Sequence, residues 1–314
     1  MLHDVVFLDR DGFAESVRIK ELPFPHRWTL YDYTAPEQMV ERLTGATIAI
    51  TSGVPISVEH LEQLPALQMI SLAMTGTDVV DLDYCRRRGI HVSNVPGYGT
   101  HAVAEHALAM IFALLRNVGR YHQLLMDVRA GKRAWSGTYF DYPIRDIRGK
   151  VLGIIGHGPI AQRLAELAGR LEMDVYFFDR DGHYQGERYL TLEQLLRRSD
   201  VVSINCPLTA QTRHMIGREQ FSWMKHDAVL INTARGAVIN EPDLIHALES
   251  GQIGGAALDV LSNEPITLDE PLLHLAATHN LILNPHIAWS STEATQGLMD
   301  TALDNVSAFV SHAS

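Results

Sequence analysis

Residues 151–180 read VLGIIGHGPIAQRLAELAGRLEMDVYFFDR. The apolar run from Val151 to Ile155 is long enough for a buried strand, and a second run from Val175 to Phe178 ends at Asp179. Between the two runs, apolar residues recur at the spacing of a helix that packs one face against a sheet. The stretch therefore predicts a strand, a glycine turn, a helix and a second strand, which together form a βαβ unit.

The turn between the first strand and the helix reads GHGPIA, which fits the pattern G-x-G-x-x-A. Gly156 allows a tight turn, Gly158 lets a pyrophosphate approach the backbone, and Ala161 is small enough for close packing of helix on strand. The N–H groups at the start of the helix then face the phosphates. A glycine turn can also serve only to pack a helix, but the flanking strands and acid favour a dinucleotide site. The turn residues assigned to that site are Gly156, His157, Gly158, Pro159 and Ile160.

Asp179 lies about 20 residues after the turn, where a carboxylate can accept both hydroxyls of an adenosine ribose. The same carboxylate would repel a 2′-phosphate, so the sequence favours NAD and NADH over NADP as the cofactor. Arg180 stands beside it and leaves two alternatives open, because a guanidinium can stack on adenine or accommodate a phosphate.

Composition limits the class of protein. A chain of 314 residues is expected to form about two domains. The net charge of −11 argues against nucleic acid or an anionic membrane as a partner. The two cysteines, Cys85 and Cys206, suit a reducing compartment, no signal peptide is visible, and no apolar run approaches membrane-spanning length. We therefore expect a cytoplasmic protein, and the sequence predicts no metal site.

The rest of the chain alternates between strand and helix patterns, which predicts α/β architecture with parallel sheets. A long helix is expected from Thr100 to about Arg120, and residues 121–150 are expected to be irregular. The aromatic density of that segment suggests packing against another surface, such as a second subunit. Further strands are predicted at 5–8, 47–50, 69–73, 90–92, 201–204, 228–231, 256–258 and 281–283, and further helices at 36–43, 58–64, 81–88, 192–196, 242–248 and 291–309.

Four polar residues stand at or just after predicted strand ends: Asp179, Arg235, Asp259 and His286. Glu264 follows closely in a loop bounded by proline. Each alone has an ordinary structural interpretation, such as a helix cap, a turn cap or a solvated histidine. Ligands of open α/β sheets bind beyond the carboxyl ends of the strands, so the group together predicts an active site beside the nucleotide.

The sequence resembles the D-isomer-specific 2-hydroxyacid dehydrogenase family in several segments spread over nearly the whole chain. The blocks SLAMTGTD, VPGYGT, ALDVLSNEP and HIAW are most similar to its glycerate dehydrogenase (hydroxypyruvate reductase) branch. The matching segments are NVPGYGTHAVAEHALAM (94–110), the glycine turn, SDVVSINCPLT (199–209), VLINTARGAVIN (229–240), AALDVLSNEP (256–265) and NPHIAW (284–289).

The resemblance implies that Arg235, Glu264 and His286 form the catalytic set. Arg235 would hold the carboxylate of a 2-keto acid and polarise its ketone. His286 would donate a proton to the carbonyl oxygen as hydride arrives from nicotinamide, and Glu264 would fix its tautomer and stabilise its charged form.

The resemblance also implies the remaining contacts. Asp259 would accept the carboxamide N–H of nicotinamide, and the backbone N–H groups of Thr75 and Gly76 would complete the substrate site with Arg235 and His286. The other family positions that line the cofactor are Thr100, Cys206, Pro207, Thr212, Thr233 and Ala234.

The implied layout is α/β with two Rossmann-like or flavodoxin-like parallel-sheet domains and a cleft between them. Residues 1–99 and 290–314 would form a discontinuous substrate-binding domain and residues 100–289 the NAD-binding Rossmann domain. Hinge closure would exclude water, and the helix from Thr100 would join a homodimer.

The expected function is hydride transfer between NAD(H) and a small D-2-hydroxy acid or 2-keto acid, with hydroxypyruvate or glyoxylate as first candidates. Val79 follows Asp78 where the family commonly has a polar residue, and Ser52-Gly53 stands where relatives of the glycerate branch often carry Asn-Lys. The loss of a lysine near the substrate mouth leaves the exact substrate open. The alternative is a nucleotide-sensing interaction protein on the same scaffold, like the corepressor-like relatives.

Overall fold

The computed structural model describes residues 2–135 and 137–313. The chain divides into two compact units, Met1–Tyr98 with Ser290–Ser314 and Gly99–Trp289. Each unit is built on one parallel sheet with helices, so the predicted α/β class with two parallel sheets is confirmed.

The first unit contains a five-stranded parallel sheet in the order β2-β1-β3-β4-β5. Fully buried apolar residues such as Phe7, Ile48 and Ile70 fill its strands, because both faces of the central strands are covered. Its strands are β1 (His3–Phe7), β2 (His26–Leu30), β3 (Ile48–Thr51), β4 (Met69–Leu72) and β5 (His91–Ser93). Its helices are the short η1 (Arg10–Gly12) and η2 (Pro36–Gln38), with α1 (Met39–Leu43), α2 (Val58–Glu62), α3 (Leu82–Arg88) and α11 (Thr292–Ala313).

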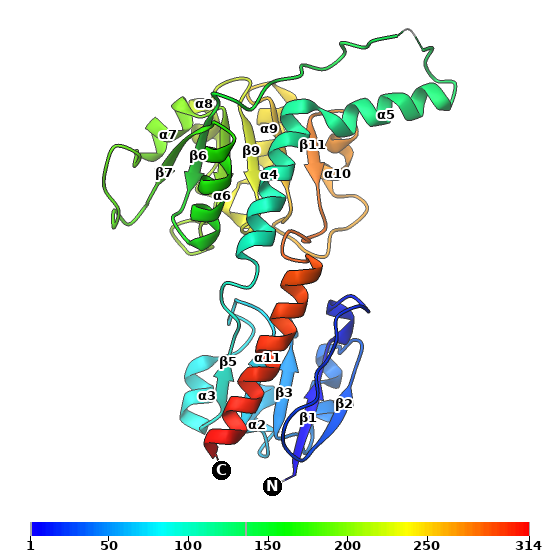
Figure 1. Cartoon of the computed structure of the whole chain (residues 1–314), viewed down its shortest axis with the longest axis vertical. Helices are drawn as coiled ribbons and strands as arrows, with labels where there is room; N and C mark the ends of the chain where they lie inside the picture. The colour runs from blue at the N-terminus through cyan, green and yellow to red at the C-terminus, as the bar shows by residue number, and fades with distance from the viewer. Residues whose placement is uncertain (1, 136, 314) are drawn as a thin grey trace. The chain divides into compact units, whose positions relative to one another are not determined.

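The final helix returns to this unit from the far end of the sequence. Ser71 in β4 donates a hydrogen bond of 3.0 Å to the carbonyl oxygen of Ala302, and the rings of His91 and Phe309 stack with centroids 5.5 Å apart. These contacts pack α11 against β4 and β5 (Figure 1) and make this unit discontinuous in sequence.

The edge strand β2 was not predicted from the sequence. Its residues HRWTL are mostly exposed, and within the described part of the chain the strand pairs only with β1. An edge strand that is poorly covered carries no run of apolar residues, so its pattern resembles that of a loop.

The second unit contains a six-stranded parallel sheet in the order β11-β10-β9-β8-β6-β7. Its first strand, β6, lies between β7 and β8, so the chain order reverses there and forms a topological switch point. Its strands are β6 (Val151–Ile155), β7 (Asp174–Phe178), β8 (Val201–Ile204), β9 (Val229–Asn232), β10 (Gly255–Leu258) and β11 (Leu281–Leu283). Its helices are α4 (Thr100–Arg116), α5 (Val118–Arg129), α6 (Pro159–Arg170), α7 (Leu192–Arg198), α8 (Arg218–Trp223), η3 (Gly236–Val238), α9 (Glu241–Glu249) and α10 (Pro271–Ala276).

Helices cover both faces of this second sheet. On one face, Ala107 and Ile111 of α4 and Leu164 of α6 pack on the strands. On the other face, side chains of α7, α8, α9 and α10 form a separate apolar cluster that includes Phe221 and Leu244. The sheet is therefore doubly wound, and only its edges remain for binding.

The long helix predicted from Thr100 to Arg120 is in fact two helices, and the prediction that residues 121–150 are irregular is wrong for its first part. Asn117 adopts a left-handed conformation with φ of 51° and ends α4, and α5 follows at an angle of 56°. Within α5 only Leu124 is buried, so the sequence has no apolar stripe from which this helix could be predicted. It projects from its unit together with the irregular segment that follows (Figure 1).

Within the described ranges, no single helix is long and apolar enough to cross a membrane; α4 and α5 meet that test only when taken together as a bent pair.

Candidate active site

The glycine turn is shaped by two different constraints. Gly156 has φ of +110°, and a Cβ at this position would lie 2.6 Å from the carbonyl oxygen of Asn205, so only glycine fits. Gly158 caps α6 with an extended backbone, and Pro159 is the first helical residue. A Cβ at Gly158 would meet no protein atom within 4 Å, so the space in front of the helix N-terminus is open for a phosphate group.

A cavity of about 310 Å³ begins at this turn and follows the carboxyl ends of β6, β7 and β8. This is the edge at the switch point where ligands of open α/β sheets bind. Asn205 Oδ1, in the cavity lining, and Thr233 Oγ1, just after β9, are buried without a hydrogen-bond partner among the described residues. An open phosphate cradle beside orphaned polar atoms fits a dinucleotide. The lining residues predicted from the sequence are Gly156, His157, Gly158, Asp179, Arg180, Cys206, Pro207 and Thr212, and those missed are Ile155, Phe178, Asp181, Tyr184, Asn205 and Met215.

The loop after β7 lines one end of this cavity. The carboxylate of Asp179 accepts the N–H of Tyr184 at 2.9 Å and that of Asp181 at 3.4 Å. Burial raises the pKa of Asp179, but the backbone N–H groups of residues 181–184 lower it by more, so the pKa lies below its ordinary value. Asp179 is therefore ionised at neutral pH.

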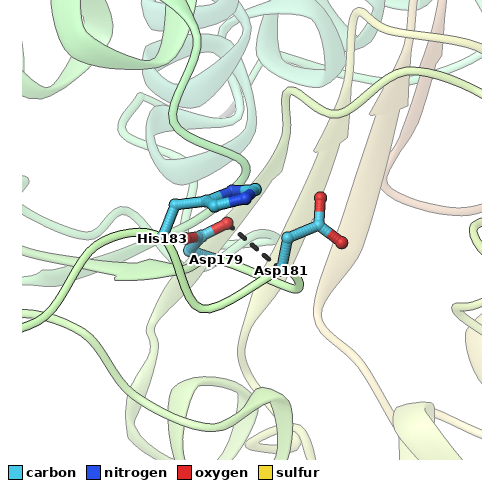
Figure 2. A group of neighbouring side chains, drawn as sticks. All are labelled: Asp179, Asp181 and His183. Atoms are coloured by element: carbon cyan, nitrogen blue, oxygen red, sulfur yellow. Dashed lines mark hydrogen bonds between the residues drawn. The ribbon is translucent and has the colours of Figure 1, made fainter.

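Asp179, Asp181 and His183 lie close enough that one ligand atom from each falls within 4.8 Å of the others (Figure 2). Each carboxylate already has a partner, however. Asp181 forms a two-pronged ion pair with Arg180 at 2.8 and 3.0 Å, and Arg180 also donates to Thr209 Oγ1 at 3.2 Å. We therefore interpret Asp179 and Asp181 as part of the polar wall of this cavity.

The side chain of His157 packs against aromatic residues, although the motif assigned the residue to the nucleotide site. Its ring packs on Tyr184 with centroids 3.8 Å apart, and the hydroxyl of Tyr189 lies 3.0 Å from Nδ1. The ring is thus part of an aromatic cluster with Phe177, and the backbone of the turn is what faces the phosphate space.

The loops after β8 and β9 are fixed from within. Thr212 Oγ1 donates to the carbonyl of Pro207 at 2.7 Å, which closes the loop that also carries Cys206. Burial raises the pKa of the Cys206 thiol to about 11, so the thiol stays protonated and is not a nucleophile. Asn232, which sequence reasoning missed, accepts the N–H of Ala234 and donates to the carbonyl of Arg235, both at 3.0 Å.

Arg235 follows this turn with an extended backbone and an exposed side chain that donates to the carbonyl of Ala234 at 2.8 Å. The next residue, Gly236, is buried, and a Cβ there would lie 2.0 Å from the backbone of Leu261. Glycine at 236 therefore lets the arginine loop pack against the loop that leads to Glu264.

Glu264 and His286 form a direct pair. Nδ1 of His286 lies 2.7 Å from Oε2 of Glu264, while Oε1 of Glu264 accepts the N–H of Leu261 at 2.8 Å. The imidazole is thus anchored through Nδ1, which leaves Nε2 as the nitrogen that can exchange a proton with a ligand. Both side chains are partly exposed, at 42% for His286 and 35% for Glu264.

Asp259, at the end of β10, is 1% exposed. Its Oδ1 accepts the N–H of Ile287 at 2.9 Å and its Oδ2 that of Ala288 at 2.8 Å. The carboxylate therefore holds the backbone directly after His286, a contact that the sequence did not reveal. Thr100 is the first residue of α4, and Pro159 and Ile160 are the first residues of α6.

In the first unit, Thr75 and Gly76 follow β4 at the carboxyl edge of that sheet. Thr75 Oγ1 donates to the carbonyl of Val95 at 3.1 Å. At the same edge, the buried carboxylate of Asp9 accepts the N–H of Ser52 at 2.8 Å and the hydroxyl of Thr51 at 3.0 Å. Burial raises the pKa of Asp9, and these donors only partly offset the rise. Asp9, which sequence reasoning missed, thus orders the loop at Ser52.

Comparisons with known proteins identify the class. Residues 108–288 match the NAD-binding domain of the D-isomer-specific 2-hydroxyacid dehydrogenases. The chain is 44% identical to a glycerate dehydrogenase of Methylorubrum extorquens over 99% of this chain and 97% of that protein. It is 36% identical to a hydroxypyruvate reductase of Blautia hydrogenotrophica over 90% of this chain and 88% of that protein. A D-lactate dehydrogenase of Aquifex aeolicus, solved with NAD and lactic acid, is similar at a TM-score of 0.77 and 30% identity over 91% of this chain and 89% of that one.

The protein is an oxidoreductase that transfers hydride between a nicotinamide dinucleotide and 2-hydroxy acids. The chain belongs to the D-isomer-specific 2-hydroxyacid dehydrogenase family. The predicted family, enzyme class and nicotinamide cofactor are confirmed, and the alternative of a nucleotide-sensing interaction protein is not favoured.

Proposed function

We propose that this enzyme reduces hydroxypyruvate or glyoxylate with NADH to the corresponding 2-hydroxy acid. The observation that carries the proposal is the 2.7 Å contact between His286 Nδ1 and Glu264 Oε2, because the loop that leads to Glu264 also packs against the Arg235 loop. The similarity to a glycerate dehydrogenase and a hydroxypyruvate reductase over nearly the whole chain supports the choice of substrate.

The roles of the side chains follow from their chemistry. The guanidinium of Arg235 holds the substrate carboxylate and polarises the keto oxygen. When bound, NADH would supply the hydride that the keto carbon accepts. His286 Nε2 gives its proton to the keto oxygen, so the carbonyl π bond is replaced by a C–H and an O–H bond. Glu264 stabilises the imidazolium and fixes the tautomer.

We also propose that residues 1–99 with 290–314 form the substrate-binding domain and residues 100–289 the nucleotide domain. In this proposal the backbone N–H groups of Thr75 and Gly76 would bind the substrate carboxylate together with Arg235. The order that Asp9 imposes on the loop at Ser52 supports a shaped site at that sheet edge.

The proposed cofactor is NADH in preference to NADPH. Asp179 is ionised and faces the end of the cavity where a 2′-phosphate would lie. Arg180 is the nearest cation in sequence, but its guanidinium is engaged by Asp181 and Thr209, which weakens its hold on a phosphate. Binding of NADPH equal to or tighter than that of NADH would contradict this preference.

We further propose a cytoplasmic homodimer. The projecting helix α5 exposes Val118 and Leu125, and the segment after it exposes Trp135 and Phe140. Large apolar side chains on a projecting element are typical of a surface that another copy covers. Sedimentation velocity would support the dimer with a mass of two chains and contradict it with the mass of one.

A panel of 2-keto acids tests the substrate proposal. Hydroxypyruvate and glyoxylate should give the highest kcat/KM, and chiral chromatography of the product from hydroxypyruvate should show the D-isomer. Hydroxyacetone, which lacks the carboxylate, is the matched control and should react poorly. Failure to oxidise NADH with any 2-keto acid would overturn the proposal.

A further inference from the structure

The catalytic histidine candidate has an unusual backbone. His286 adopts φ of +54°, a left-handed conformation that residues other than glycine rarely take without support. Three hydrogen bonds from this segment end on one residue. The N–H of His286 donates to the main-chain oxygen of Asp259 at 2.9 Å, and the next two N–H groups donate to its carboxylate oxygens at 2.9 and 2.8 Å. Asp259 therefore holds the conformation of the histidine loop.

A carboxylate as deeply buried as that of Asp259 requires compensation for its lost solvation. Two backbone N–H groups supply part of it, one to each oxygen. The further partner is His106, whose Nε2 lies 3.7 Å from Oδ1 of Asp259. This distance exceeds a hydrogen bond but lies within the reach of an ion pair.

His106 comes from a different element. It lies on α4, on the same side as the buried Val103 and Met110, and α4 packs against β9, β10 and β11. Its Nε2 is buried and has no hydrogen-bond partner among the described residues. A buried imidazole nitrogen without a hydrogen bond, beside a buried carboxylate, is an arrangement that solvation alone does not favour.

We propose that His106 is a positioning residue for His286 that acts through Asp259. The imidazole stabilises the carboxylate electrostatically, the carboxylate holds the two N–H groups after His286, and these keep the left-handed backbone from which the catalytic ring projects. His106 itself does not touch the reacting atoms. The inference rests on the proposed function only for the role of His286, because the contacts among His106, Asp259 and the loop are made by the chain itself.

Three variants test it. His106→Leu removes the nitrogen, His106→Gln retains an N–H donor, and His101→Leu removes an exposed histidine from the same helix as the matched control. The measurements are hydrogen exchange of the amides of Ile287 and Ala288 in the cofactor-free protein, then kcat and KM for the keto acid and the Kd for NADH.

In His106→Leu, exchange of both amides should rise and kcat should fall, each by about five- to tenfold, the scale of coupling within one network. KM for the keto acid should stay within about twofold, because Arg235, the predicted carboxylate anchor, is untouched. Any rise in the Kd for NADH should accompany the rise in exchange, because Asp259 is also the predicted partner of the nicotinamide carboxamide. His106→Gln should recover most of both effects, and His101→Leu should match the parent protein.

Several results would overturn the inference. Unchanged exchange with reduced kcat would mean that His106 does not act through the loop, and unchanged exchange with unchanged kcat would mean that it has no positioning role. A raised Kd for NADH with normal exchange would assign His106 to cofactor binding. If His106→Leu does not fold, His106→Asn, whose shorter amide withdraws from Asp259, carries the same two expectations. Hydrogen exchange is measured without substrate or turnover. It therefore tests the role of His106 in the loop even if the proposed reaction is wrong.

Discussion

The two ends of the carboxyl edge of the second sheet differ in how their side chains are held and exposed. At the end formed by β6, β7 and β8, Asp179 is held by backbone N–H groups of its own loop, and the Cys206 thiol is buried and protonated. At the end formed by β9, β10 and β11, Arg235 is exposed, and His286 and Glu264 are partly exposed. At the first end, hydrogen bonds and burial hold the side chains in place around an open cavity. At the second end, the side chains are accessible to solvent while the backbone that carries them is held by hydrogen bonds.

The difference matches the roles proposed for the two ends. A nucleotide is bound by backbone N–H groups and one carboxylate that keep their positions. A proton donor must instead meet the substrate with a titratable atom, so its side chain stays accessible while its backbone is restrained. Here the restraint comes from Asp259, which is 1% exposed behind His286. Changes at the reacting end should therefore alter turnover, and changes at the nucleotide end should alter the choice of cofactor.

The largest effect is expected for His286→Ala. The change removes the proton donor and should lower kcat for keto-acid reduction by about 10²–10⁴-fold. The Kd for NADH, measured by fluorescence titration, should be unchanged because the nucleotide cavity lies at β6 to β8. A variant that loses NADH binding and turnover together would break the proposed division between the two ends.

Arg235→Lys should have the next largest effect. Lysine keeps the charge but loses the planar fork, so kcat/KM should fall by about 10- to 100-fold. Steady-state kinetics with hydroxypyruvate, alongside NADH titration, checks this expectation. Parent-level kcat/KM would show that Arg235 is not the carboxylate anchor.

Asp181→Ala sharpens the account of the nucleotide end. It releases the guanidinium of Arg180, which Asp181 holds at 2.8 and 3.0 Å, and removes a negative charge from the cavity wall where the ribose is proposed to bind. The ratio of NADPH to NADH affinity should rise by about five- to tenfold, the scale of one exposed charge interaction. Asp174→Ala, at the opposite end of β7, removes an equal charge and is the matched control. An unchanged ratio would mean that the ion pair does not limit phosphate binding.

The smallest expected effect concerns the opposite edge of the sheet. Asp200 accepts the N–H of Val151 at 2.8 Å and the ammonium of Lys225 at 2.9 Å. Burial raises the pKa of Asp200, but these two donors lower it by more, so it lies below its ordinary value. Stability from this group is therefore present above the ordinary carboxyl pKa and is lost as pH falls through the lower folded-state pKa.

Asp200→Asn should thus lower the free energy of unfolding by about 1–2 kcal/mol at neutral pH. Urea unfolding of both proteins should show a constant difference down to about pH 5 and a shrinking one below about pH 4. The value of kcat should not change, because the residue is remote from both functional ends. A difference independent of pH down to the acid range would contradict the assigned role of the charge.

The nucleotide end could be predicted from the sequence because it is local. Residues 151–180 carry the strand, the turn, the helix and Asp179 in one contiguous stretch, and each residue type reflects a nearby constraint such as the positive φ of Gly156. The ion pair of Asp181 with Arg180 was missed, because the pairing of neighbouring charges in a loop has no sequence pattern.

The reacting end was predicted only as a set of residues. Arg235, Glu264 and His286 were recognised from resemblance and strand ends, but their geometry depends on contacts between distant segments. Asn232 and Asp259 order the loops through side-chain hydrogen bonds to backbone groups, and such partners are set by the fold. The same reason applies to the break between α4 and α5, because the left-handed backbone of Asn117 that causes it changes no pattern of apolar residues in the sequence.

The most direct test of the central claim is whether Glu264 and His286 act as one acid–base unit. Single-turnover rates of NADH oxidation by hydroxypyruvate would be measured for Glu264→Gln, for His286→Ala and for the double variant. Because Glu264 acts through the imidazole that it holds at 2.7 Å, the double variant should be no slower than His286→Ala alone, although Glu264→Gln by itself should be about tenfold slower than the parent. If the two losses instead multiplied in the double variant, Glu264 and His286 would act independently and the account would be contradicted.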